Sequence, residues 1–445
     1  MPLVLTIERR IGAGALRGET IKASLSDSVD VQIERRRDGD RYVLERGAIG
    51  LNAPAALPDG AGMLVTGRLD YVDADRWREL LGGEDDRGPI PPDAAFDLKM
   101  KELDFGGRRF NDVALRAGAS GSDWIADISA KELSGKVTWR PEGHGRIIAR
   151  LKHFSLPEPT PDRAKQDPPR NLPALDIVAD NLIVGDNSLG KLELMAVNEA
   201  LDWRIESLVL TGPESLLTAR GTWENWALRP TVNVAVSLDV RDAGKYLERI
   251  GYPRTMQHGM AKLTGTLSWS GSPQALDLAT LTGDLDLKAE KGQFLRAEPG
   301  VARLLGILSM QSWVTLDFRD LFGEGFAFDT IRGKAGIVDG VMSTRQFEMR
   351  GPSARVTMDG RIDLANETQD LHARVEPSVD SIPSALIVLA SPVWGVATYL
   401  LQKILKNPLG QVFAFEYKVT GTWTEPKVER LKADVRTAEG LPLPQ

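Results

Sequence analysis

The chain has 445 residues, a formal net charge of −7, no cysteine and four histidines. Without cysteine there is no disulfide framework, thiol nucleophile or thiolate metal site, and the widely spaced histidines argue against a histidine-based metal centre or catalytic triad. The net negative charge argues against a nucleic-acid partner, because phosphate binding needs a concentrated basic face.

The N-terminal third reads as one strand after another. Its first residues, MPLVLTIERR, alternate like a strand and lack the basic start and long apolar core of a signal peptide, so we expect none in this sequence. Turn signals such as Pro58-Asp59-Gly60 separate the segments that follow. The exception is Asp73–Leu81, whose apolar residues have helical spacing and predict one or two helical turns.

A Pro-rich run, Ser155–Pro173, is the clearest linker or surface loop in the chain. We therefore predict a β-rich segment at residues 1–154, this loop at 155–173, and a second β-rich segment with repeats at 174–291. The remainder, residues 292–445, forms a C-terminal region.

Two internal similarities indicate repeated multi-strand units. The stretch Asp97–Trp124 aligns without a gap on Asp176–Trp203. In the same way Leu208–Trp223 aligns on Phe347–Ile362, with a strand, a Gly-Pro turn, a second strand and a glycine in both copies. Self-similarity of this kind predicts an elongated stack in which each unit contacts only its neighbours.

Alternating apolar residues predict strands with one apolar face and one polar face. The clearest example is Thr231–Val240. Because few helices are predicted to cover so many one-sided strands, either two sheets face each other or the apolar face covers another molecule. Acyl chains are a natural occupant, since burying each methylene contributes about 0.8 kcal/mol. The candidates for lining an apolar groove are Val232, Val234, Val236, Leu238, Val240, Phe326, Phe328, Phe347, Met349, Val356, Met358, Phe413, Phe415, Tyr417 and Val419.

Two helices are predicted in the C-terminal region. Glu298–Met310 places apolar residues on one face, and Ile382–Asn407 contains an uncharged run broken by Pro383 and Pro392. A helix at 392–406 would be about 22 Å long, too short to cross a bilayer core of about 30 Å. It is amphipathic, which suits either an interfacial helix or a cap on the end of the stack. The candidates for membrane contact are Val393, Trp394, Val396, Tyr399, Leu400, Leu401, Lys403, Ile404, Leu405 and Lys406.

Signals of an enzyme are weak. The glycine pairs at 323–325 and 333–336 are not followed by the helix with Lys and Ser or Thr that a phosphate-binding loop needs. Carboxylates are numerous among the 62 acidic residues, and no pair stands out as the one a glycosidase requires. We therefore predict no catalytic residues, no metal site and no cofactor.

The stretch Val314–Leu364, VTLDFRDLFGEGFAFDTIRGKAGIVDGVMSTRQFEMRGPSARVTMDGRIDL, resembles the C-terminal region of the YhdP branch of the AsmA-like proteins of Gram-negative bacteria. The resemblance extends more loosely from Gly292 to Leu431. It implies a twisted β-sheet curled into an open groove with an apolar floor, and a periplasmic bridge that moves phospholipid toward the outer membrane. Members of this family carry an N-terminal membrane anchor and a longer body, so we expect this chain to be a C-terminal piece.

The combined hypothesis is a mainly β protein: an elongated, twisted antiparallel sheet of repeated units curled into an open apolar groove, with two or three short helices. It would be a periplasmic, membrane-associated lipid-transfer segment, with phospholipids, the membrane on the outer-membrane side and other envelope proteins as partners. The rival is a scaffold or assembly factor for outer-membrane proteins that pairs its sheet edges with client strands. A third class, an enzyme on envelope polysaccharide, would need a polar cleft with two aligned carboxylates. The sequence leaves open which sheet face lines the groove, because a one-residue register error would invert it.

Overall fold

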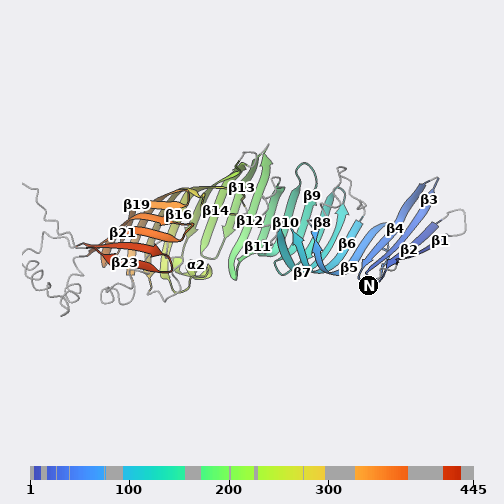
Figure 1. Ribbon diagram of the computed structural model, residues 1–445, viewed down its shortest axis with the longest axis horizontal. Helices are drawn as coiled ribbons and strands as arrows, with labels where there is room; N and C mark the ends of the chain where they lie inside the picture. Colours follow the sequence, from blue (N-terminus) through green and yellow to red (C-terminus); the bar gives the residue numbers. More distant parts are fainter. Residues whose placement is uncertain are drawn as a thin grey trace, which may run out of the picture. The chain divides into compact units, whose positions relative to one another are not determined.

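The computed structural model describes residues 5–11, 18–26, 28–39, 41–74, 76, 94–155, 172–199, 202–224, 229–273, 275–295, 326–378 and 414–431. Most of these residues lie in long, twisted strands, which confirms the mainly β class. The chain divides into two units, Met1–Asn198 and Glu199–Gln445, called unit 1 and unit 2 below. Within each unit, successive strands lie side by side in chain order (Figure 1).

Unit 1 is a sheet in which each described strand pairs with the next one along the chain. The pairs β4–β5, β5–β6 and β10–β11 are parallel, and the other pairs are antiparallel. The strands are β1 (Leu5–Ile11), β2 (Gly18–Leu25), β3 (Val29–Asp38), β4 (Arg41–Leu51), β5 (Gly62–Asp73), β6 (Ala94–Phe105), β7 (Arg108–Ser120), β8 (Asp123–Ser129), β9 (Leu133–Arg140), β10 (Arg146–Ser155), β11 (Ala174–Val184) and β12 (Asn187–Glu199).

Parallel neighbours need a connection that returns from one end of the sheet to the other. The connection between β10 and β11 contains the Pro-rich stretch that the sequence marks as a loop or linker. Arg146 is in register with Ala174 and Ser155 with Ile183. The Pro-rich stretch therefore joins two hydrogen-bonded neighbours of one sheet.

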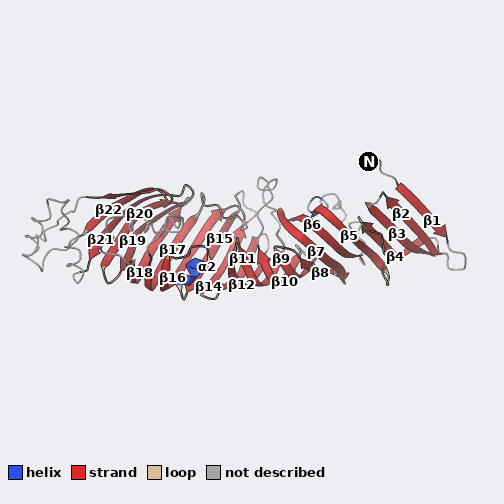
Figure 2. Ribbon diagram, turned by 90° about the horizontal axis from the view of Figure 1, so that it is seen from below, coloured by secondary structure: helices blue, strands red, loops and turns tan. Residues whose placement is uncertain are grey.

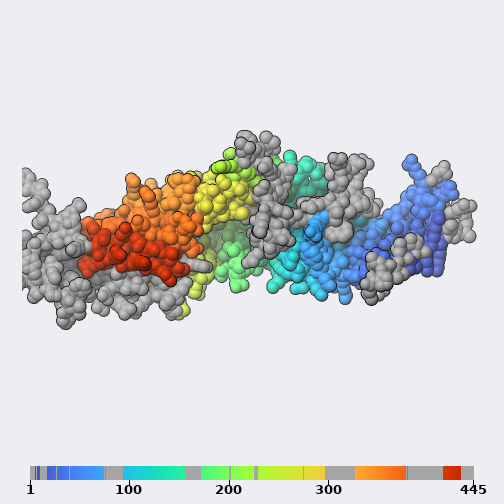
Figure 3. Space-filling model, viewed as in Figure 1, coloured from blue at the N-terminus to red at the C-terminus, as the bar shows by residue number. Residues whose placement is uncertain are grey.

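Unit 2 is a sheet in which every described strand pairs antiparallel with the next. Its residues pass from green through yellow and orange to red in the space-filling view (Figure 3). They are β13 (Asp202–Thr211), β14 (Ser215–Glu224), β15 (Thr231–Val240), β16 (Met256–Ser270), β17 (Thr282–Phe294), β18 (Phe326–Val338), β19 (Val341–Arg350), β20 (Ala354–Asp363), β21 (Thr368–Pro377), β22 (Phe415–Thr422) and β23 (Pro426–Arg430).

The register of the strands confirms both predicted repeats. In the first, Leu98 pairs with Leu115, and the residues aligned with them in the second copy, Ile177 and Leu194, also pair. In the second, Leu210 pairs with Leu217, and their aligned counterparts Met349 and Val356 pair in the same way. The second pair of hairpins also shares an irregularity, because the register shifts between Ile205 and Leu208 in one copy and between Thr344 and Phe347 in the other.

The described helix α2 (Ala243–Arg249) connects β15 to β16 in unit 2 (Figure 2). No apolar periodicity in the sequence predicts this helix, although Asp242 is a strong N-cap residue. The Asp242 carboxylate accepts a hydrogen bond from the Lys245 backbone N–H at 3.1 Å. At the other end, Arg249 donates from Nε to Oε2 of Glu214 at 2.8 Å. One side chain thus caps the helix, and another ties it to the β13–β14 turn.

The predicted helices fall mostly outside the described residues. At the predicted turn of Asp73–Leu81, Ala74 and Arg76 are helical, and the Arg76 backbone N–H donates to Oδ1 of Asp73 at 2.9 Å. The rest of that segment and the helices at 298–310 and 392–406 lie outside the described residues. Among the residues that the structure does describe, no helix is long and apolar enough to cross a membrane.

Candidate functional site

The candidate site is the apolar face of the sheet in unit 2. Residues in register on neighbouring strands lie on the same face, so rows across the sheet can be read from the pairing. One row from β15 to β22 is apolar at every position: Val240, Ala261, Ala289, Ile331, Met349, Val356, Val375 and Phe415. A second row on the same face, four residues further along most strands, is Val236, Gly265, Leu285, Ala335, Thr344, Gly360, Leu371 and Val419, with one threonine.

The structure brings many of the predicted groove residues onto this face. Four of them stand in the first row and two in the second, and Phe347, Met358 and Tyr417 share a third. Val232 and Val240 are buried, whereas Val234, Val236 and Leu238 between them are half-buried. Phe326 and Phe328 belong to the same buried apolar cluster as Met349 and Val356. Phe413 and all ten candidates for membrane contact lie outside the described residues.

Burial on this face is extensive from β17 to β22. Val419 is 0% exposed, and Met349 and Leu371 are 1% exposed. The rings of Phe294 and Phe328 lie 5.3 Å apart between centroids, within the range of favourable aromatic pairs. Burial also raises the pKa of the Tyr417 phenol to about 12. Each such side chain contributes about 1.5–3 kcal/mol when fully buried, so this apolar face is also the core of unit 2.

The opposite face of unit 2 carries ion pairs that run across the strands. Arg355 in β20 donates to Glu348 in β19 at 2.7 Å, and Arg374 in β21 contacts Glu416 in β22 at 3.3 Å. Hydrogen bonds from Arg350 and then Arg355 hold the pKa of the Glu348 carboxyl below its usual value. Cross-strand pairs of opposite charge are typical of a solvated sheet face. The two faces of this sheet therefore differ completely in chemistry.

Two glycines on the apolar face lie where the neighbouring backbone leaves no room for a Cβ. Gly360 has φ of +138°, and a Cβ there would lie 2.3 Å from the carbonyl oxygen of Asp370 on the next strand. Gly221, its counterpart in the earlier copy of the repeat, would place a Cβ 2.3 Å from the carbonyl oxygen of Asn233. No side chain fits at this distance, and glycine kinks of this kind give a sheet its curvature.

Unit 1 has an apolar face of its own, and none of its residues is among the predicted groove residues. A row from β2 to β12 contains Ala23, Val31, Ile49, Val65, Phe96, Ala117, Ala126, Val137, Ala149, Ile177 and Leu194. A second row contains Leu25, Val29, Leu51, Gly67, Leu98, Leu115, Ile128, Gly135, Leu151, Ala179 and Leu192. Apolar residues occur at every second position in short stretches such as Phe96, Leu98 and Met100. This alternation is weak in any single strand of unit 1.

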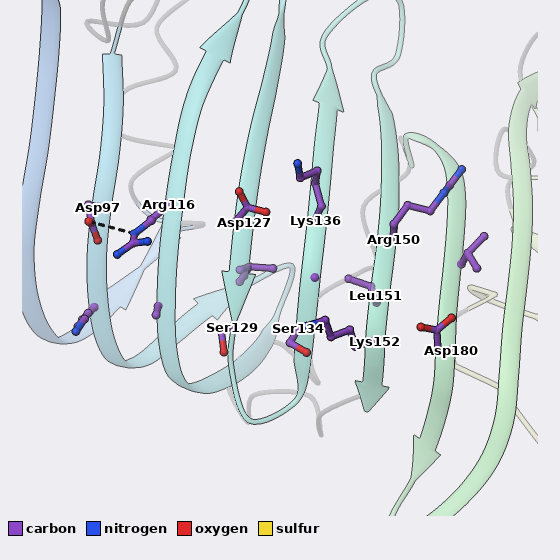
Figure 4. Close-up of a pocket in the computed structure, with 15 residues that line it drawn as sticks. Asp97, Arg116, Asp127, Ser129, Ser134, Lys136, Arg150, Leu151, Lys152 and Asp180 are labelled. Carbon is purple, nitrogen blue, oxygen red and sulfur yellow. Dashed lines mark hydrogen bonds and ion pairs between the residues drawn. The ribbon is translucent and has the colours of Figure 1, made fainter. Parts of the chain in front are cut away.

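The polar face of unit 1 contains a pocket of about 720 Å³ over β6–β11 (Figure 4). One row of residues in register crosses this pocket: Asp97, Arg116, Asp127, Lys136 and Arg150. The charges of the first four residues alternate between negative and positive. Arg116 donates to Asp97 at 3.3 Å, and the side chains project from successive strands (Figure 4). This is a cross-strand charge ladder. Ser134, which also lines the pocket, has its Oγ 3.0 Å from Nδ1 of His153, and Nε2 of that histidine lies 3.3 Å from the carbonyl oxygen of Lys131. Among the described residues this serine–histidine contact has no carboxylate on the histidine, as a catalytic triad would need.

Within the described ranges, no group of three or more histidine, aspartate and glutamate residues could hold a metal ion. In unit 2, the polar side chains near the apolar rows include Thr344 and Gln369. From β17 to β22 the apolar side chains already pack against one another, and the face is more open on β15, where Val234, Val236 and Leu238 are half-buried. It offers apolar contact with few polar groups to select an orientation. Such a surface fits long hydrocarbon chains better than a small polar substrate.

Comparison with known proteins gives a family and one curated relative. The family model "YhdP protein" matches residues 2–428. The chain is also 23% identical over 355 residues to the "Intermembrane phospholipid transporter YhdP" of Escherichia coli (strain K12). This match covers 75% of the chain and 28% of that protein. The chain thus spans well under half of the relative's length.

Two solved structures of an outer membrane protein of Vibrio cholerae show only faint similarity. The loop-deletion mutant OmpTdeltaL8 is 8% identical, with 84% of this chain and 91% of that chain covered and a TM-score of 0.11. In-vitro folded OmpT is 7% identical, with 98% and 93% covered and a TM-score of 0.11. At that TM-score neither similarity carries an argument about fold or function.

Proposed function

The chain belongs to the YhdP protein family, and on this premise we propose that it is a segment of a protein that carries phospholipid between two membranes. The curated relative is named an intermembrane phospholipid transporter. The segment proposed here would work without catalysis, by giving acyl chains a continuous apolar surface.

The observation that carries this proposal is the row from Val240 to Phe415, which crosses eight strands without a polar side chain. An acyl chain on such a surface gains about 0.8 kcal/mol for each methylene removed from water. It needs no placed hydrogen-bond partners, so it can move from one strand to the next without breaking any. A polar headgroup would stay at the edge of the face, in contact with water.

Family membership and the one-sided sheet support a more specific proposal for the groove, the compartment and the partners. The apolar face would form the floor of an open groove, with the glycine kinks at Gly221 and Gly360 supplying curvature. The protein would act in the periplasm in association with membranes, with its C-terminal region toward the outer membrane. Phospholipids would be its cargo, and other envelope proteins would be further partners.

The test places photocrosslinking residues at Val236 and Phe415, on the apolar face, and at their neighbours Ser237 and Glu416, on the polar face. The full chain is purified from a Gram-negative periplasm and examined by native mass spectrometry with lipid extraction. We expect phospholipid adducts at Val236 and Phe415 and none at the two control positions, because adjacent residues of a strand face opposite sides. Equal labelling of both faces, or no lipid at all, would contradict the proposal.

A substitution gives a second measurement on the same surface. Val236→Asp puts a charge in the second apolar row, and we expect several-fold less bound phospholipid because burying an unpaired charge is costly. Ser237→Asp adds the same charge to the polar face and should leave bound lipid unchanged. Correctly folded Val236→Asp protein with the wild-type amount of lipid would exclude this position from the path. Protein adducts along β23 in place of lipid would instead favour a scaffold that pairs strand edges.

A further inference from the structure

A charged cluster lies on the apolar face of unit 1, at one end of β1–β3. Glu19 in β2 is in register with Arg35 in β3, and Arg9 in β1 is in register with Ile21. Glu19 and Ile21 are two residues apart on one strand, so both point to the same face. That face is the apolar one, because Ala23, the next residue on that side, belongs to the first apolar row. The three charged side chains therefore stand where the apolar surface ends along these strands.

Glu19 holds both arginines at once. Its side chain is 2% exposed, and its Oε1 accepts a hydrogen bond from Nε of Arg9. Its Oε2 accepts one from Nε of Arg35 at 2.7 Å. The Arg35 guanidinium also lies over the ring of Tyr42, 4.2 Å from its centroid, a favourable cation–π distance. A buried carboxylate thus positions two guanidinium groups, and the cluster keeps one excess positive charge.

The arginines retain donors for a further ligand. Both contacts to Glu19 use the Nε atoms, and in the described part of the chain no hydrogen bond occupies the four Nη groups of Arg9 and Arg35. The side chains are 54% and 31% exposed, so an outside molecule can reach them. Paired guanidinium groups are the donors best matched to phosphate oxygens, since each presents a fork of N–H groups.

The apolar strip beside the cluster is long enough for an acyl chain. From Glu19 to Leu25, β2 extends about 20 Å at roughly 3.4 Å per residue. One leaflet of a bilayer core is about 15 Å thick, half of the full hydrocarbon thickness. Along this distance β2 presents Ile21, Ala23 and Leu25, and β3 presents their register partners Ile33, Val31 and Val29. A molecule with its phosphate at the arginines would find apolar contacts along its whole hydrocarbon length.

We propose that Arg9 and Arg35, positioned by Glu19, bind the phosphodiester of a phospholipid whose acyl chains lie along the apolar face of β2 and β3. The inference rests on the proposed function, which assigns lipid to the apolar faces, and it adds where a headgroup is held. Free phosphate offers similar oxygens to the two arginines. The apolar strip favours the lipid, and the experiment below separates the two sources.

The experiment uses the full chain with a photocrosslinking residue at Ala23 and vesicles of phosphatidylglycerol as the lipid source. Arg35→Gln and Arg9→Gln each remove one guanidinium, and we expect about tenfold less lipid adduct at Ala23, because a hydrogen bond to a charged group is lost. The matched control is Arg36→Gln. Arg36 faces the other side of β3 and pairs with Glu45 at 3.3 Å, so its removal should leave the adduct unchanged. Circular dichroism checks that each variant is folded. If Arg35→Gln unfolds, Arg9→Gln still tests the site, because Arg9 is the more exposed of the two arginines.

A second crosslinking position, Val236 in unit 2, reports on the proposed function in the same preparations. Equal lipid adducts at Ala23 in all three variants, with adducts retained at Val236, would overturn the headgroup site and leave the proposed function standing. Absence of lipid at both positions in the wild-type chain would overturn both. Radiolabelled inorganic phosphate is the remaining probe. If it binds the wild-type chain and is lost in Arg35→Gln while lipid adducts stay unchanged, the site takes free phosphate and the inference is wrong.

Discussion

At the scale of single residues, the apolar faces depend on side chains of two kinds. Branched and aromatic residues supply the contact area, and glycines allow the strands to bend at chosen positions. Gly360 shows the second role clearly, because it combines a φ of +138° with a carbonyl oxygen 2.3 Å from where a Cβ would stand. A larger residue at this position must shift the backbone of β20 or β21.

Gly360→Ala should therefore destabilise unit 2. We expect a loss of about 1–3 kcal/mol, because the new methyl group meets a backbone oxygen and the φ angle is unfavourable for an L side chain. The measurement is the midpoint of urea unfolding. Gly336→Ala is the control, since its Cβ would find only Oδ1 of Asp284 at 3.8 Å, and it should change stability by less than about 0.5 kcal/mol. Equal effects of the two substitutions would show that the close approach at Gly360 is relieved without cost.

At the scale of elements, an ion pair links α2 to the sheet. Glu214 accepts two hydrogen bonds from Arg249, from Nε at 2.8 Å and from Nη2 at 2.9 Å. The side chain of Glu214 is 12% exposed and that of Arg249 is 30% exposed. The first of the causes that lower the pKa of the Glu214 carboxyl is the hydrogen bond from Arg249.

This pair predicts a stability difference that depends on pH. Because the folded state lowers the pKa of Glu214, the pair stabilises fully above the unfolded value of 4.5 and loses its effect as the pH falls through the folded pKa. Arg249→Gln should cost about 1 kcal/mol at neutral pH, a modest value because the arginine is partly exposed. The cost should decrease as the pH falls below 4.5, because the unfolded state then takes up the proton first. Urea midpoints measured at about pH 7 and about pH 3 test this.

The control for this measurement is Arg241→Gln. Arg241 donates from Nη2 to the carbonyl oxygen of Pro213 at 2.8 Å, and a carbonyl does not titrate. Any cost of Arg241→Gln should therefore be the same at both pH values. A pH-dependent cost for Arg241, or a constant cost for Arg249, would contradict the assignment of the acid response to Glu214.

At the scale of the whole molecule, each unit has its own apolar face and its own polar face. In unit 1 the apolar rows run through parallel as well as antiparallel pairs, whereas all described pairs of unit 2 are antiparallel. The faces continue through both kinds of pairing because residues in register share a side in either case. If the apolar faces of unit 1 and unit 2 both bind lipid, crosslinkers in either unit should give lipid adducts.

Charge placed in one unit should then reduce lipid in that unit alone. Ile177→Asp enters the first apolar row of unit 1, and we expect several-fold less lipid adduct at a crosslinker on its register partner Leu194. Adducts at Val236 in unit 2 should persist. Val178→Asp, on the opposite face of the same strand, is the control and should leave both signals unchanged. Loss of lipid in both units from Ile177→Asp alone would show that the two faces do not bind independently.

The sequence by itself determined the class of this fold and much of its repetition. Strict alternation in Thr231–Val240 is enough to predict a one-sided strand, because side chains of a strand point to opposite faces with period two. The two internal alignments predicted repeated hairpins that the register confirms. The sequence did not predict the helix α2, because its seven residues are too few to show the helical periodicity of apolar residues.

Only the tertiary structure decided which residues share a row. Pairing joins residues far apart in the chain, such as Val240 with Ala261 or Val375 with Phe415, and no local pattern specifies such a partner. For the same reason the sequence could not place Glu19, Arg9 and Arg35 on the apolar face, since their side depends on the register of three strands. Alternation gives each strand an apolar side and a polar side. Within each unit, the register between strands joins the apolar sides into one continuous apolar face.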